Sequence, residues 1–226
     1  MYKQTKKNKV REDTLSYVIN LLTKDRDQSC CVRSSYVREL YEWFLGQNYD
    51  LKSKEIVKKI PLGYIELWEE FHKSFIGVKT AKDLRVCYFS GPEPMNDFDV
   101  LVKNCIHPHN IWAFEVDKNT YKDAIKEIKQ SNFSMLKIHR CSIEQFFREI
   151  PKKFDIIYLD FCSTFLSRKH TTRIISTLFK YQRLKSPGVI ITNFASPDIE
   201  KQDEKIKYAK LMSKYLGTKD YLCDIN

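Results

Sequence analysis

The chain has 226 residues, of which 42% are hydrophobic and 30% charged. A chain of this length buries roughly 70% of its unfolded surface and can fold without disulfides or metals. Its proportions of hydrophobic and charged residues exclude collagen-like, low-complexity and wholly disordered proteins. No apolar run approaches the roughly 18–20 residues that span a bilayer, and the first residues are polar and basic. We therefore expect no membrane span, no secretory signal and a cytoplasmic location.

The net charge is +10 at pH 7. Such a surplus is usual in proteins that contact nucleic acid or another polyanion, which makes RNA or DNA a candidate partner. However, 29 lysines outnumber 10 arginines, although arginine is the better bidentate phosphate ligand. Frequent Lys, Asn and Ile are also what an AT-rich coding sequence produces, so the charge leaves both interpretations open.

Seven cysteines are spaced irregularly and form no C-x-x-C pair, which predicts neither a disulfide framework nor a zinc ribbon. Cys105, His107 and His109 form C-x-H-x-H, and His139 and Cys141 follow later in the chain. Neighbouring alternate positions make a poor tetrahedral set, and Pro108 favours plain turn chemistry. We expect no metal site.

The first part of the chain predicts helices only. Residues 1–11 are polar and read as a frayed tail, after which apolar side chains recur at helical spacing over residues 15–22, 37–44 and 62–75. We expect a helical N-terminal region over residues 1–80, a possible surface for a protein partner, and a second domain over residues 81–226.

From residue 83, short apolar runs alternate with amphipathic helical stretches. The predicted strands cover residues 84–90, 111–115, 135–140, 154–161 and 188–193, and the predicted helices cover residues 97–104, 120–130, 142–150, 171–185 and 196–217. Runs that are apolar throughout, separated by helices, specify a parallel sheet covered on both faces. Ligands of such sheets bind outside the carboxyl ends of the strands.

The first two predicted strands end in residues suited to a nucleoside ligand. Gly91 follows the first strand and lets the backbone approach a ligand without a Cβ in the way. Glu115 ends the second strand, 24 residues later, near the place where a carboxylate holds ribose hydroxyls, and Asp117 is the second choice. Both acids could instead cap the following helix.

The third and fourth strands add a candidate adenine wall and a candidate catalytic acid. Ser142 and Ile143 follow the third strand. Asp160 ends the fourth, where a buried acid is costly unless it is used or paired, whereas Asp155 at the opposite end of that strand has a structural role. Cys162 is either a nucleophile or an inert buried thiol.

The order and spacing of these segments resemble the class I S-adenosylmethionine-dependent methyltransferase fold, over residues 83 to about 217. The resemblance implies an α/β, doubly wound, mainly parallel Rossmann-like sheet that carries S-adenosylmethionine as cofactor. It implies catalytic roles for Asp160 and Cys162, since the segment after the fourth strand holds the target amine in many nucleic-acid methyltransferases. The cofactor-binding residues it implies are Ser90, Gly91, Pro92, Glu115, Asp117, Ser142, Ile143 and Asp160.

Some residues depart from the family pattern. The first turn carries one glycine where the family has two or three. The segment after the fourth strand is Asp-Phe-Cys-Ser rather than Asp/Asn-Pro-Pro-aromatic. The sixth and seventh strands of the family should follow Gly217, where this sequence has nine residues. Two functions therefore remain: a methyltransferase that acts on or binds nucleic acid, or a catalytically inactive scaffold that serves as a nucleic-acid-binding or complex-forming subunit.

Overall fold

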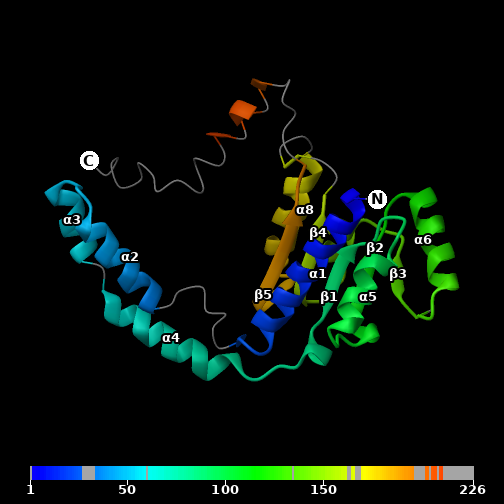
Figure 1. Cartoon of the computed structure of the whole chain (residues 1–226), viewed down its shortest axis with the longest axis horizontal. Helices are drawn as coiled ribbons and strands as arrows, with labels where there is room; N and C mark the ends of the chain where they lie inside the picture. Colours follow the sequence, from blue (N-terminus) through cyan, green and yellow to red (C-terminus); the bar gives the residue numbers. More distant parts are fainter. Residues whose placement is uncertain are drawn as a thin grey trace. The chain divides into compact units, whose positions relative to one another are not determined.

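We describe a computed structural model of the chain, shown in Figure 1. The structure describes residues 2–26, 34–59, 61–133, 135–161, 164–165, 169–195, 202–203, 205–207 and 209–210. The chain divides into two compact units, one of residues 1–26 and 78–208 and one of residues 27–77 and 209–226. Within the described ranges, every helix is too short or too polar to cross a membrane.

The first unit is built on a five-stranded sheet, whose strands are β1 (Val86–Phe89), β2 (Ile111–Phe114), β3 (Lys137–His139), β4 (Phe154–Asp160) and β5 (Leu184–Asn193). The strand order is β3-β2-β1-β4-β5, and every neighbouring pair is parallel. This is the order of the doubly wound Rossmann sheet, with its switch point between β1 and β4. The predicted α/β fold is confirmed.

Helices cover both faces of this sheet (Figure 1). On one face α1 (Tyr2–Leu22), α5 (Met95–Lys103) and α6 (Lys118–Gln130) share a core with Val86, Tyr88 and Ile156. On the other, α7 (Ile143–Glu149) and α8 (Lys169–Lys180) share a core with Cys87 and Ile157. Since successive strand residues point to opposite faces, apolar residues at every position are required to bury both sides.

The N-terminal helix differs from the prediction. The expected tail is helical from Tyr2, and the first 26 residues form one compact unit with the sheet instead of joining a helical region over residues 1–80. The reason is the apolar stripe of α1: Leu15, Val18 and Leu22 are buried in the sheet core, where each such side chain contributes about 1.5–3 kcal/mol. In the sequence, this apolar stripe cannot be distinguished from the stripe of a helix that packs in a separate helical bundle.

The second unit contains α2 (Ser34–Gly46), α3 (Leu51–Lys58) and α4 (Leu62–Ile76). The sequence did not predict α3, which begins after Asp50, whose carboxylate accepts the Ser53 N–H at 2.9 Å. On α4, whose apolar residues recur at helical spacing, Trp68 and Phe75 are exposed. A protein partner for these helices stays a prediction.

The segment between α8 and β5 also differs from the prediction. The predicted helix over residues 171–185 ends at Lys180, because Gln182 adopts a left-handed backbone with φ of 51° and the Arg183 N–H turns back to the Leu178 carbonyl. β5 then begins at Leu184, so that Lys185 lies on a strand.

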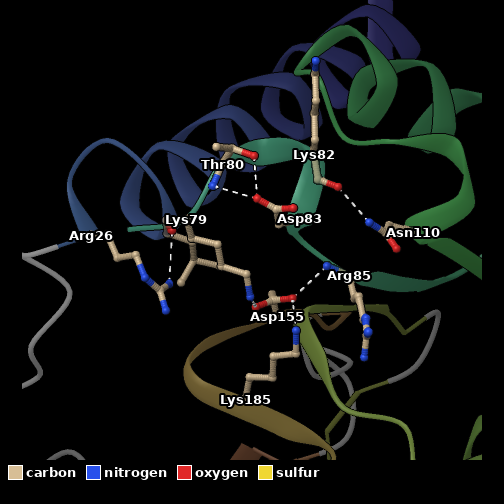
Figure 2. Close-up of polar contacts among 10 residues, drawn as sticks. Arg26, Lys79, Thr80, Lys82, Asp83, Arg85, Asn110, Asp155 and Lys185 are labelled. Atoms are coloured by element: carbon tan, nitrogen blue, oxygen red, sulfur yellow. Dashed lines mark hydrogen bonds and ion pairs between the residues drawn. The ribbon is translucent and has the colours of Figure 1, made fainter. Parts of the chain in front are cut away.

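The amino end of β4 carries a buried ion cluster (Figure 2). The Asp155 carboxylate is fully buried, pairs with the Lys79 ammonium, lies 3.0 Å from the Lys185 Nζ and accepts the Arg85 N–H at 2.7 Å. Burial lowers the pKa of Lys185, against the attraction of Asp155. The cluster ties the chain entering β1 to β4 and β5, at the end of the sheet opposite the candidate site.

Candidate active site

A cavity of about 430 Å³ lies at the carboxyl ends of β1, β2 and β4, within the size range of small-ligand sites. Residues that follow β3 line it as well, so all four strand ends that the sequence singled out contribute to this cavity. Of the predicted site residues, those that line it are Ser90, Gly91, Pro92, Glu115, Ser142, Ile143 and Asp160. Asp117 is not among the lining residues, and Cys162 lies outside the described part of the chain.

The turn after β1 presents bare backbone to this cavity. The Ser90 N–H donates to the Phe114 carbonyl at 3.1 Å, which fixes the start of the turn against β2. Gly91 then adopts a left-handed backbone with φ of 59°, and a Cβ built there would meet no protein atom within 4 Å. A ligand can therefore approach the Gly91 backbone closely.

The two acids after β2 have different surroundings. Glu115 lines the cavity, half-buried, and its Oε1 accepts the Asp117 N–H at 2.8 Å. Asp117 is exposed and caps α6 by accepting the N–H groups of Asn119 and Thr120 at 3.0 and 2.8 Å. The hydrogen bonds from Thr120 lower the pKa of Asp117. Asp117 therefore has the capping role that was its alternative.

Apolar side chains form one wall of the cavity. Phe89, Phe114, Ile143 and Phe161 line it, and the rings of Phe89 and Phe161 meet edge to face at 5.3 Å. Ser142 is the N-cap residue of α7, yet its hydroxyl makes no capping hydrogen bond. The wall suits a flat heteroaromatic ring with a polar edge.

Two acids and two cations meet on another side of the cavity. The Asp160 Oδ1 accepts a hydrogen bond from the Asn193 amide at 2.9 Å, and its Oδ2 lies 3.3 Å from the Lys7 Nζ. Asp97, at the start of α5, is buried and forms an ion pair of 2.5 Å with the Arg11 Nε. Burial raises the pKa of Asp97 to about 6, against the attraction of Arg11.

Lys7, Arg11 and Asp97 were missed by the sequence analysis. Lys7 and Arg11 lay in the stretch that resembled a tail, although their spacing of four places them on one face of a helix. Asp97 had a visible signal, since it lies between Met95 and Phe98 on the inward side of α5. An acid among inward apolar residues needs a partner or a ligand.

No group of three or more His, Cys, Asp or Glu side chains that could hold a metal is found in the described ranges. In the C-x-H-x-H segment, the His107 Nδ1 accepts the His109 N–H at 3.1 Å. That contact belongs to turn chemistry.

No family model matches this chain, and no curated protein matches it. Solved structures of similar fold include NSun6 from Pyrococcus horikoshii with SFG, at 15% identity over 58% of this chain and 38% of that one, with a TM-score of 0.41. The delta-N METTL16 MTase domain has 17% identity over 78% and 86% of the two chains, with a TM-score of 0.39. The human methyltransferase 10 domain containing protein has 19% identity over 68% and 76%, with a TM-score of 0.34. The chain thus spans well under half of the NSun6 chain.

Proposed function

We propose that this protein is an S-adenosylmethionine-dependent methyltransferase that acts on nucleic acid. The observation that carries the proposal is the cavity at the carboxyl ends of the strands. It brings together the open Gly91 turn, the Glu115 carboxylate, the apolar wall and Asp160, which come from four separate segments of the chain.

The side chains around the cavity fit the parts of this cofactor. Glu115 is an acceptor for the two ribose hydroxyls, and the wall with Phe114 and Ile143 suits the adenine ring. The Asp97 carboxylate and the Arg11 guanidinium offer opposite charges for the ammonium and carboxylate of the methionine part. The backbone of Gly91 leaves room for close contact.

When bound, S-adenosylmethionine supplies a methyl group that forms a bond to the acceptor as its bond to sulfur breaks, and sulfur keeps the bonding electrons. The protein's own contribution is positioning and proton transfer. We assign positioning of the acceptor and proton transfer to Asp160, because Asn193 and Lys7 hold its carboxylate at the edge of the cavity. A carboxylate held in this way can orient an acceptor amine or hydroxyl and take its proton.

Charge supports a nucleic acid as the acceptor. The chain carries +10, and α1 brings Lys7 and Arg11 to the cavity. The second candidate function, an inactive scaffold, is favoured by the single glycine of the turn after β1. The two functions differ in whether methyl groups are transferred.

The test is transfer of a radiolabelled methyl group from S-adenosylmethionine to pooled RNA and, separately, to DNA. We expect transfer by the natural chain and a loss of at least about 100-fold in Asp160→Asn, since a positioned base contributes roughly 10²–10⁴-fold. Asp117→Asn makes the same substitution at a residue outside the cavity and should retain the rate of methyl transfer. Absence of transfer to either pool, with S-adenosylmethionine bound, would favour the scaffold.

A further inference from the structure

A second cavity, of about 620 Å³, lies between α1 and the ends of β4 and β5. It shares Lys7 and Arg11 with the first cavity, and it is also lined by Asn193, whose amide donates to Asp160. The Asp160 carboxylate is thereby held by two residues of the second cavity while it lines the first. A group bound in the second cavity would contact the residues that hold Asp160, so the two cavities adjoin at this carboxylate.

The lining of the second cavity combines positive charge with neutral polar groups. Lys6, Lys7 and Arg11 come from α1, and the described lining contains no acidic residue. Thr192 and Asn193 add a hydroxyl and an amide from the end of β5. Lys7 and Arg11 already pair with Asp160 and Asp97, which leaves Lys6 as the lining cation without an ion pair among the described residues. Lys6 therefore favours an anionic group, and Thr192 and Asn193 favour a polar, hydrogen-bonding body beside it.

One side of the cavity is apolar and aromatic. Ile191 and Tyr158 lie there, and Tyr158 packs against the sheet core. The Tyr158 hydroxyl is neutral at physiological pH, and burial raises its pKa further, to about 12. An aromatic surface beside uncharged donors and acceptors is what proteins use to hold an unstacked base, with lysines on the adjoining phosphates.

We infer that the second cavity receives an unpaired base of a single-stranded nucleic acid, and that Lys6 binds a phosphate next to that base. A duplex is disfavoured because a base has to leave its stack to enter a cavity between a helix and a sheet. The inference rests on the proposed function, for which it supplies the acceptor site.

The test measures binding of a fluorescent ten-nucleotide single strand of mixed sequence, as RNA and as DNA, to the full chain by anisotropy. Lys6→Glu should weaken binding about tenfold or more and lower the slope of log affinity against log salt by about one or more. The matched control is Lys122→Glu, which makes the same charge change at an exposed position of α6, a helix that contributes no residue to either cavity. We expect it to weaken binding by no more than about twofold, because exposed charges separated by more than a Debye length are screened.

A second variant tests the cavity without a change of charge. Thr192 is exposed at the end of β5, so Thr192→Trp should fold normally, as checked by circular dichroism, and weaken strand binding by filling the space. Equal losses in Lys6→Glu and Lys122→Glu, or full binding by Thr192→Trp, would overturn the inference. So would a nucleoside monophosphate that competes as well as the strand.

Failure of this inference is distinguishable from failure of the proposed function. S-adenosylhomocysteine should bind Lys6→Glu as it binds the natural chain, because Lys6 does not line the first cavity. A chain that binds S-adenosylhomocysteine but no single strand would overturn the acceptor site alone. A chain that binds the strand but neither S-adenosylhomocysteine nor S-adenosylmethionine would overturn the methyltransferase proposal and leave a nucleic-acid-binding cavity.

Discussion

Replacement of Glu115 by alanine tests the assignment of the ribose site. One carboxylate oxygen of Glu115 accepts the exposed Asp117 N–H, and the side chain also lines the cavity. A hydrogen bond to a charged group contributes about 1.5–3 kcal/mol, and each 1.4 kcal/mol is tenfold in affinity. Glu115→Ala should therefore weaken binding of S-adenosylhomocysteine by about ten- to 150-fold, while water replaces the carboxylate at the Asp117 N–H.

The matched control is Asp117→Ala, two residues away. Loss of the α6 cap should lower the free energy of unfolding by about 1 kcal/mol and leave the dissociation constant unchanged. Calorimetric titration gives the affinities, and urea unfolding gives the stabilities. The reasoning is refuted if Glu115→Ala binds as the natural chain does, or if Asp117→Ala is the variant that loses binding.

Three other substitutions give separate expectations. Gly91→Val should abolish S-adenosylhomocysteine binding in a calorimetric titration and cost about 1–2 kcal/mol of stability, because φ at this position is left-handed; unchanged affinity would remove Gly91 from the site. Asp155→Ala should lower the free energy of unfolding by about 3–5 kcal/mol, since two lysines lose their buried partner. The control is Asp13→Ala at an exposed position of α1, which should have little effect; similar losses for the two variants in urea unfolding would contradict a stabilising role of the ion cluster. The folded-state pKa of Asp97, about 6, lies above its ordinary value of 3.8, so the folded state binds the extra proton and stability should fall as pH rises through this window. Asp97→Asn should remove that slope from unfolding curves measured between pH 4 and 7, and an identical slope in the variant would contradict the shift.

The sheet and most of the first cavity could be predicted because they follow from local patterns. Continuous apolar runs specify parallel strands, and parallel strands place their carboxyl ends together. Gly91, Glu115 and Asp160 could therefore be grouped before any contact was known. The same reasoning preferred Glu115 to Asp117 but could not tell which of them caps the helix, because both lie within reach of the strand end and of the helix start.

The role of α1 could not be predicted, since it depends on tertiary contacts. Lys7 and Arg11 look like ordinary surface charges until α1 packs on the sheet, where they meet Asp160 and Asp97. The predicted end of α8 was wrong for a different reason. The apolar spacing continues past Lys180. The helix ends because Gln182 adopts a left-handed backbone, and no glycine at this position indicates that conformation in the sequence.

The central claim is that the cavity at the carboxyl ends of the strands binds the methyl donor. The measurement that tests it most directly is a calorimetric titration of the full chain with S-adenosylhomocysteine, which cannot react further. We predict one binding site per chain with a dissociation constant in the micromolar range, weakened by Glu115→Ala and not by Asp117→Ala. The absence of binding heat at several temperatures, with a protein that circular dichroism shows to be folded, would contradict the account.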